Sequence, residues 1–180
     1  MSVRRIAINT GGGDAPGLNA VIRAVTLGAV DRGWEVLGIR DGYNGLFDDE
    51  TPGAAPGIVP LHHAQVRDIT HLGGTMLGTT NRGNPFATGR DGAVIDRLRE
   101  LEVDVLVAVG GDGSLSIANR FAEAGVPVIG VPKTIDHDLE ETDDTTGFDS
   151  AVAFATECID RLVATASAHS RIMVVEVMGR

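Results

Sequence analysis

The stretch from Val105 to Leu139 reads VLVAVGGDGSLSIANRFAEAGVPVIGVPKTIDHDL and decides the fold. Residues 103–109 are nearly all apolar and rich in β-branched side chains, which predicts a strand buried on both faces. A glycine turn, a helix and a second strand over 126–131, ending at Pro132, follow. This order predicts an α/β, doubly wound fold with a largely parallel sheet and helices on both faces.

The glycine turn Gly110–Ser114 has the composition of a phosphate site. Its glycines lack Cβ atoms, so backbone N–H groups can approach an anion closely. Ser114 can cap the next helix, whose N-terminus carries partial positive charge. Asp112 would repel bare phosphate unless a cation such as Mg²⁺ bridges the two groups. The turn therefore predicts a metal–phosphate site, against the alternative of a tight turn without a ligand.

Charged and polar residues follow the second strand. Lys133, Thr134, Asp136, His137 and Asp138 lie where an open α/β sheet places its ligands, at the carboxyl end of a strand. Either aspartate could instead serve only as a turn or cap residue. Their position beside Lys133 favours a functional role.

Composition narrows the class of protein. The 180 residues can bury the core of one domain, and a net charge of −10 argues against a nucleic-acid partner. The single cysteine, Cys158, falls in a helical pattern, so we expect it in the core of a protein from a reducing compartment. No run reaches transmembrane length and no signal peptide is visible, so we expect a cytoplasmic protein without a membrane partner.

Elsewhere the periodicity predicts further alternation of strands and helices. A second glycine turn over 10–19 matches neither the G-x-G-x-x-G fingerprint nor the G-K-[ST] loop. A third segment rich in Gly and Thr, 73–85, contains Arg82, which could reach an anion. The remaining expected elements are strands at 6–9, 36–39 and 172–175, the last of them buried, and helices at 17–32, 89–101 and 147–168.

Together these motifs resemble the 6-phosphofructokinase family of the bacterial type, whose members use ATP or pyrophosphate. The matching segments are Gly12–Ala20, Gly110–Ser114, Pro132–Asp136 and Met178–Arg180, in the family's order and spacing. The resemblance spans residues 1–180 but only about the first half of a family member. It implies the N-terminal, phosphoryl-donor-binding domain, the first of two, with the second half absent from this chain.

The resemblance implies a donor site with Mg²⁺ as cofactor. Arg82 would contact the donor and stabilise the transferring group, and Asp112 would hold the metal. The full set of implied donor-binding residues is Gly13, Arg82, Gly111, Asp112, Gly113 and Ser114.

It also implies a site for fructose 6-phosphate. Asp136 would be the general base for the C1 hydroxyl, assisted by Asp138 near the metal, and Arg180 would lie close to the phosphoryl group in flight. Arg171 would bind the sugar phosphate across a subunit interface, so we expect a homo-oligomer for the intact enzyme. The implied substrate-binding residues are Thr134, Ile135, Asp136, Arg171, Met178, Gly179 and Arg180.

Two residues disagree about the phosphoryl donor. Relatives that use pyrophosphate usually carry Asp at the place of Gly113 and Lys at the place of Lys133. A missing side chain leaves room that ATP requires, whereas a lysine can coexist with ATP. We therefore expect ATP, with pyrophosphate as the alternative.

The chain departs from the family pattern at two places. His137 replaces the usual asparagine between the aspartates, and its protonation would perturb Asp136, which predicts sensitivity to pH. At the effector site of allosteric members Arg23 is present, but Leu27 and Val163 stand where two other arginines would be. We therefore expect no regulation by ADP or phosphoenolpyruvate of that kind.

For these 180 residues alone, two other hypotheses remain open. The piece could be a non-catalytic domain that binds a nucleotide or sugar phosphate. It could also expose apolar surface that only a partner half would bury.

Overall fold

The computed structural model describes residues 3–47 and 56–178 and contains one six-stranded sheet. The strand order is β3-β2-β1-β4-β5-β6, in which β3 is antiparallel to β2 and every other pair is parallel. The strands are β1 Arg5–Gly11, β2 Glu35–Ile39, β3 Ile58–Pro60, β4 Val105–Gly110, β5 Val128–Thr134 and β6 Thr146–Gly147. The helices are α1 Leu18–Val30, the short 3-10 helix η1 Asn44–Leu46, α2 Pro85–Thr88, α3 Asp91–Glu100, α4 Asp112–Glu123 and α5 Phe148–His169.

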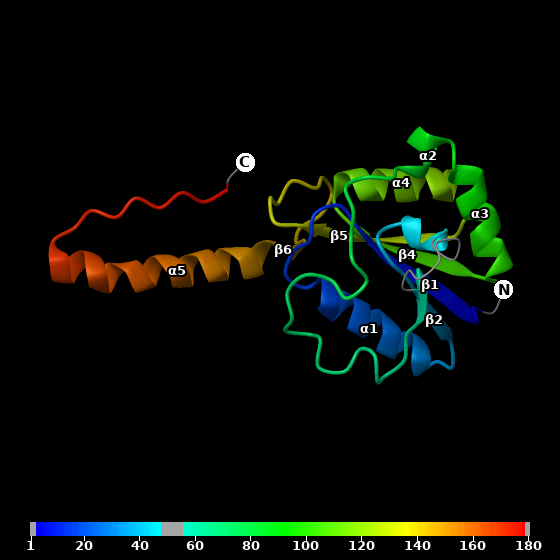
Figure 1. Cartoon of the computed structure of the whole chain (residues 1–180), viewed down its shortest axis with the longest axis horizontal. Coiled ribbons are helices and arrows are strands. Elements are labelled where there is room, and N and C mark those ends of the chain that lie inside the picture. The colour runs from blue at the N-terminus through cyan, green and yellow to red at the C-terminus, as the bar shows by residue number, and fades with distance from the viewer. Residues whose placement is uncertain (1–2, 48–55, 179–180) are drawn as a thin grey trace.

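Helices cover both faces of the sheet, which confirms the predicted fold class (Figure 1). On one face, Ile6 and Ile8 of β1 pack in a core cluster with Leu18 and Ile22 of α1. On the other face, α3 and α4 complete a second cluster that contains the fully buried Phe121. β1 and β4 are buried on both sides because they lie in the middle of the sheet, as their apolar sequences predicted.

The chain winds outward in two directions from the centre of the sheet. β1, α1 and β2 lead to one side, whereas β4, α4 and β5 lead to the other. Gly11 at the end of β1 is paired in register with Gly110 at the end of β4. The two glycine turns therefore meet where the strand order reverses, which is the usual ligand position in open α/β sheets.

Strand β5 extends beyond the predicted end at Pro132 and continues to Thr134. Pro132 is tolerated because β4 ends opposite it at Gly110, while pairing with β6 begins only at Lys133. The missing N–H therefore falls where pairing with β4 ends and pairing with β6 has not yet begun. As a result, Lys133 and Thr134 are held by the sheet itself rather than by the loop that follows.

Ser114 does not cap α4, so that prediction was wrong. The helix begins two residues earlier, at Asp112, with Gly111 as the cap residue in an extended conformation and no side-chain cap bond. Ser114 instead lies against the ends of the two central strands. A Cβ placed on Gly11 would come within 2.7 Å of the Ser114 Oγ.

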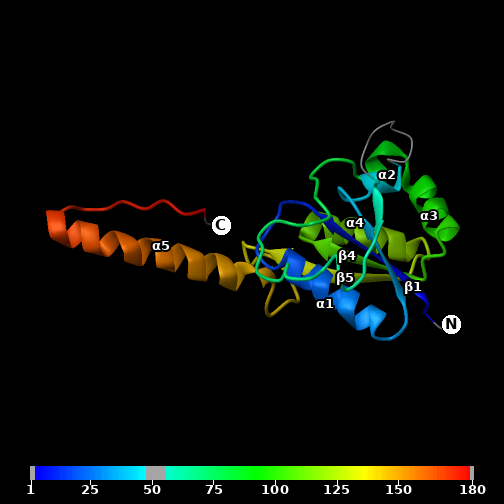
Figure 2. The same ribbon diagram turned by 60° about the horizontal axis from the view of Figure 1, so that its bottom comes forward.

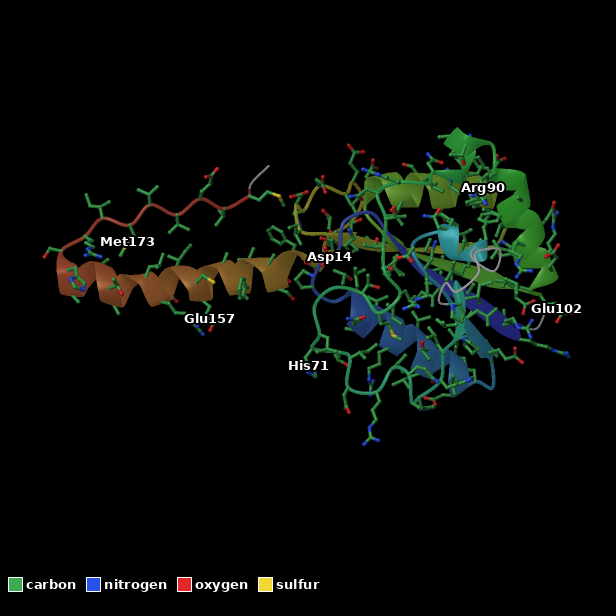
Figure 3. The ribbon with its side chains drawn as sticks, in the orientation of Figure 1. Asp14, His71, Arg90, Glu102, Glu157 and Met173 are labelled. Atoms are coloured by element: carbon green, nitrogen blue, oxygen red, sulfur yellow. The ribbon has the colours of Figure 1, made fainter. Side chains whose placement is uncertain are left out.

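Helix α5 extends away from the sheet, and the residues after it run back alongside it (Figures 1 and 2). Glu157 and Met173 both lie on this projection, well away from the strands (Figure 3). The prediction that Cys158 lies in the core was wrong, because this residue is exposed and α5 has no buried residue. In the described structure only the start of this helix lies against the sheet, so most of its large apolar side chains are exposed.

The buried strand predicted at 172–175 is also absent from the described structure. Ile172 and Val174 are each 92% exposed, and no strand pairs with this segment. Its apolar pattern is that of a buried strand, but the neighbours that a strand needs are missing. No helix in the described part of the chain combines the length and apolar character that a membrane span requires.

Candidate functional site

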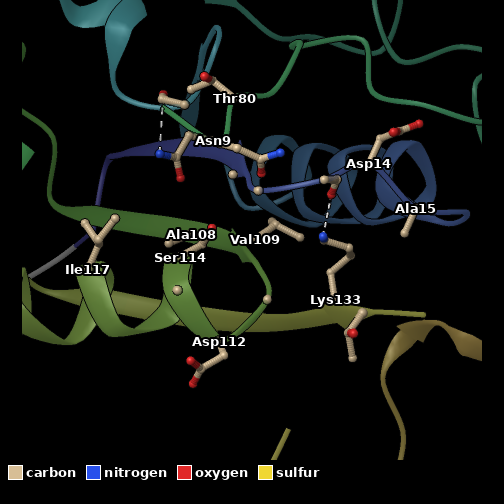
Figure 4. Close-up of a pocket in the computed structure, with 18 of the residues that line it drawn as sticks. Asn9, Asp14, Ala15, Thr80, Ala108, Val109, Asp112, Ser114, Ile117 and Lys133 are labelled. Atoms are coloured by element: carbon tan, nitrogen blue, oxygen red, sulfur yellow. Dashed lines mark hydrogen bonds between the residues drawn. The ribbon is translucent and has the colours of Figure 1, made fainter. Parts of the chain in front are cut away.

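A cavity of about 590 Å³ lies at the carboxyl edge of the sheet, where the two glycine turns meet. Its main walls are the turn after β1, the segment before α2, the start of α4 and the end of β5 (Figure 4). Residues of β4, the turn after β2 and Met178 complete the lining. It is lined by Asn9, Gly11–Ala15, Gly42, Tyr43, Thr80–Asn84, Ala108, Val109, Gly111–Ser114, Ile117, Lys133–Asp136, Asp138 and Met178.

The glycines around this cavity have different surroundings. Gly11 and Gly110 lie under Ser114, where a Cβ on either would approach the serine side chain within 2.7 Å or less. In contrast, a Cβ on Gly13 or Gly113 would meet no atom within 4 Å. The first pair lets α4 start directly above the strand ends, and the second pair leaves open space beside the backbone for a ligand.

Asp112 is the exposed acidic residue in the first turn of α4. The helix N-terminus stabilises its negative charge. Figure 4 shows the Asp112 and Asp14 carboxylates pointing away from one another, on opposite sides of the cavity.

No group of three or more His, Cys, Asp or Glu that could hold a metal occurs among the described residues. One carboxylate beside a phosphate-sized space suits Mg²⁺, which binds proteins through one or two carboxylates and completes its shell with phosphates and water.

Lys133 lies buried between the two glycine turns, with only 6% of its surface exposed. Its Nζ donates a hydrogen bond to the carbonyl oxygen of Gly13, drawn as a dashed line in Figure 4. Burial lowers the pKa of Lys133, while the negative charges of Asp14, Asp136 and Asp138 oppose this shift. The residue thus brings a cation into the cavity at the cost of partial desolvation.

The turn after β5 is fixed by hydroxyl groups. The Thr134 hydroxyl donates to the Asp138 Oδ1 at 2.9 Å and accepts from the Asp136 backbone N–H at 3.1 Å. The Thr145 hydroxyl donates to the Thr134 carbonyl oxygen at 3.1 Å. These bonds hold the backbone of Asp136 at the edge of the cavity, so its carboxylate is presented by a turn of defined shape.

His137 follows Asp136 with a φ of 53°, in the left-handed region. Histidine occupies this region more readily than most residues, so the backbone conformation at His137 suits its side chain. The imidazole is packed against Phe148 at the start of α5, with ring centroids 4.8 Å apart. The exposed side chain of His137 does not line the cavity.

The wall that contains Arg82 has neither helix nor strand. It contacts the first glycine turn through a bond from the Gly12 N–H to the Thr80 carbonyl oxygen at 3.1 Å. The Thr79 hydroxyl also donates to the Gly12 carbonyl oxygen at 2.6 Å. Arg82 is exposed and lines the cavity.

Most of the residues predicted from the sequence do meet in this cavity. They are Gly13, Arg82, Gly111, Asp112, Gly113, Ser114, Lys133, Thr134, Ile135, Asp136 and Met178. Arg171 does not reach it, because this residue lies just beyond the far end of α5. Gly179 and Arg180 lie outside the described residues.

Sequence reasoning missed several cavity residues, of which Asn9 and Tyr43 are the clearest examples. Tyr43 follows β2, whose carboxyl end lies at the same edge of the sheet as those of β1 and β4. That topology is the signal that could have identified it. Burial raises the pKa of Tyr43 to about 12, although the side chain of Asn9 opposes the shift.

Comparison with known proteins gives the same family as the motifs. A family model described as phosphofructokinase matches residues 5–180. The chain belongs to the phosphofructokinase family. Within this family it is 50% identical to the ATP-dependent 6-phosphofructokinase 1 of a Nostoc species, a match that covers 98% of this chain and 50% of the relative. It is 46% identical to the pyrophosphate–fructose 6-phosphate 1-phosphotransferase of Dictyoglomus thermophilum, over 100% of this chain and 50% of the relative.

A solved structure agrees with these sequence matches. The phosphofructokinase of Pichia pastoris in the T-state is similar with a TM-score of 0.87 at 33% identity, over 100% of this chain and 20% of that chain. The phosphofructokinase chain described here thus spans about half the length of the curated relatives it matches.

Proposed function

We propose that this chain is the donor-binding part of an enzyme that transfers a phosphoryl group from ATP to the C1 hydroxyl of fructose 6-phosphate, giving fructose 1,6-bisphosphate. The observation that supports this most directly is the single cavity containing two open glycine turns, Asp112, Lys133 and Asp136. Phosphoryl transfer requires chiefly positioning and charge neutralisation, together with a base for the incoming hydroxyl. The residues around the cavity can supply each of these.

On the donor side, the backbone of Gly13 and of Gly111–Ser114 binds the phosphates, aided by the positive N-terminus of α4. Arg82 contacts the donor from the opposite wall and stabilises charge on the transferring group. Asp112 holds Mg²⁺, which when bound neutralises charge on the phosphate oxygens. The open space at Gly113 accommodates the part of ATP that pyrophosphate lacks.

On the acceptor side, Asp136 takes the proton from the C1 hydroxyl as its oxygen forms a bond to the γ-phosphorus. The bond between that phosphorus and the β,γ-bridging oxygen breaks, and ADP leaves with the electron pair. Thr134 and Ile135 orient the sugar beside this base. Met178 lines the cavity, and we assign Gly179 and Arg180, which follow it in the sequence, to the same sugar-phosphate site.

The intact enzyme acts as a homo-oligomer in the cytoplasm. Arg171 supports this proposal because it is exposed and distant from the cavity of its own chain. An arginine in that position can serve the sugar 6-phosphate of a neighbouring subunit.

Pyrophosphate is the alternative donor, and Lys133 is the residue that favours it. Its amino group lies beside the glycine turn, so it could bind a compact, highly charged phosphate donor. However, part of its hydrogen-bonding capacity is used by the Gly13 carbonyl oxygen. No side chain fills the space at Gly113, and that space favours ATP.

Calorimetric titration of the chain with Mg-ATP, and separately with Mg-pyrophosphate, tests the donor. We expect the chain to bind Mg-ATP. In Asp112→Asn the affinity should fall at least tenfold, which is about the contribution of one charged hydrogen bond. Gly113→Asp should abolish the preference for ATP, because its carboxylate would occupy the open space. Binding of pyrophosphate alone would refute the ATP assignment.

A turnover assay beside these titrations separates the enzyme from a non-catalytic binding domain. We expect the chain to bind Mg-ATP but to turn over little fructose 6-phosphate by itself, because it spans half of a relative. If the full-length protein bound Mg-ATP and fructose 6-phosphate but showed no turnover, the kinase assignment would be wrong and the binding-domain hypothesis would stand.

A further inference from the structure

The cavity wall formed by Thr80–Asn84 has no regular secondary structure to hold it. It is the last part of a segment, residues 72–84, that is neither helix nor strand. Two glycines within it, Gly74 and Gly78, have a φ of 69°, a conformation that permits sharp changes of direction. The position of this wall must therefore come from contacts made by other elements.

Asn19, in the first turn of α1, makes the most extensive of these contacts. The residue is buried, with only 3% of its surface exposed. Its Nδ2 donates to the carbonyl oxygens of Leu72 at 3.1 Å and Gly73 at 3.3 Å. Its Oδ1 accepts from the backbone N–H of Met76 at 2.8 Å. One amide group thus binds both sides of the turn at Gly74 and closes it onto α1.

A second set of bonds carries this anchoring toward the cavity. The hydroxyl of Thr10, a fully buried residue of β1, donates to the Gly78 carbonyl oxygen at 2.6 Å and lies 3.1 Å from the Thr75 hydroxyl. Two residues further on, the Thr80 Oγ1 accepts from the Arg82 backbone N–H at 3.0 Å. Residues 72–82 are therefore held at successive points, by Asn19 at 72–76, by Thr10 at Gly78 and by the Gly12 N–H at the Thr80 carbonyl oxygen.

We propose that Asn19 is a positioning residue: by clamping residues 72–76 onto α1, it sets where Arg82 stands relative to the phosphate donor. This inference rests on the proposed donor site, although Asn19 itself does not line the cavity. Removing the amide would leave two carbonyl groups and one N–H of the segment without their buried partners. The segment would then move toward water, and Arg82 would move with it.

The first test is hydrogen exchange on the chain and its Asn19→Ala variant. We expect faster exchange for the amides of residues 76–82, while those of β4 remain protected. Asn119→Ala is the control, because Asn119 is an exposed asparagine of α4 whose amide donates to Glu123 of the same helix at 3.0 Å. Unchanged exchange in residues 76–82 would overturn the proposal, whether or not the chain binds ATP.

The second test is a double-mutant cycle with Arg82→Ala, read by Mg-ATP titration. We expect Asn19→Ala to weaken Mg-ATP binding about tenfold when Arg82 is present, and less than about twofold when Arg82 is already alanine. A merely structural residue would give equal losses in both backgrounds, and that result would overturn the proposal. If the wild-type chain did not bind Mg-ATP, the donor site would fail, but hydrogen exchange would still decide the role of Asn19.

If Asn19→Ala does not fold, Asn19→Asp replaces it in both tests. The aspartate keeps the size of the side chain and the acceptor for Met76 but loses both N–H donors. We expect the same pattern of exchange in residues 76–82. Protection equal to that of the wild type would contradict the clamp.

Discussion

Two of the glycines at the cavity edge are required by packing, and two are not. Gly11 and Gly110 lie under Ser114, which leaves no room for a side chain, whereas Gly13 and Gly113 face open space. All of them belong to similar glycine-rich motifs in the sequence. Only the three-dimensional contacts separate glycines that support the fold from glycines that leave space for a ligand.

Substitution by alanine should distinguish these roles. In Gly110→Ala the new Cβ would overlap Ser114 and stand 3.0 Å from the Gly11 carbonyl oxygen, so we expect a loss of about 1–3 kcal/mol in the free energy of unfolding. Gly113 is a helical residue with free space around it, so Gly113→Ala should gain about 0.4–1 kcal/mol. Urea unfolding of both variants measures these changes. A loss for Gly113→Ala as large as that for Gly110→Ala would contradict the distinction.

Lys133 is the only lysine in the chain, so its titration can be isolated. Burial lowers its pKa in the folded state below the ordinary value of 10.5. Between these two pKa values the unfolded chain binds more protons than the folded chain, so stability rises with pH across that window. We expect the wild type to gain stability relative to Lys133→Met as the pH rises toward 10.5. Urea unfolding of both proteins across this range measures it, and a difference that stays constant with pH would be inconsistent with a lowered pKa.

At the scale of elements, apolar pattern predicted the sheet well. Strands β1 and β4 lie at the centre of the sheet, buried on both faces, and their continuous apolar runs predicted them correctly. The same logic predicted that Cys158 of α5 lies in the core and that residues 172–175 form a buried strand, but these residues are exposed or only partly buried. A sequence pattern reports that a segment can be buried, but it does not report whether the covering element is present.

Prediction of the site residues from sequence was limited in a related way. Asp136 and Asp112 were predicted because they follow strands directly in sequence. Asn19 was not, because its role depends on a segment more than fifty residues away, joined to it only by side-chain bonds to the backbone. No local periodicity encodes such a contact.

A pair of phenylalanines tests the difference between the sheet and α5. Phe154 of α5 is 68% exposed, whereas Phe121 of α4 is fully buried and packs against Tyr43 and Phe86. We expect Phe121→Ala to cost about 3–5 kcal/mol, and Phe154→Ala to change stability by less than about 0.5 kcal/mol. Thermal unfolding of the two variants measures this. Comparable destabilisation by both would mean that α5 packs against the rest of the molecule in solution.

At the scale of the whole molecule, the donor cavity and the projecting helix depend on different parts of the chain. With the exception of Met178, every residue that lines the cavity precedes α5. The apolar side chains of Val152, Phe154 and Val163 are exposed along the projection, together with Ile172 and Val174 beyond it. Apolar surface gathered in this way favours association with another protein surface. We therefore expect the chain to self-associate through α5 while its donor cavity remains accessible.

A chain that ends at Ser150 tests this separation. It keeps all six strands, helices α1 to α4 and the contact between His137 and Phe148, but it loses most of α5 and the segment that follows. Because α5 contributes no buried residue, we expect the shortened chain to unfold within about 2–4 °C of the original, the shift that 1 kcal/mol or less would give. Its affinity for Mg-ATP should stay within about twofold, since Met178 alone is lost from the cavity.

Analytical ultracentrifugation should show less self-association, because the exposed apolar side chains have been removed. Unfolding of the shortened chain at 25 °C would show that α5 supports the sheet in solution, and retained self-association would place the associating surface elsewhere.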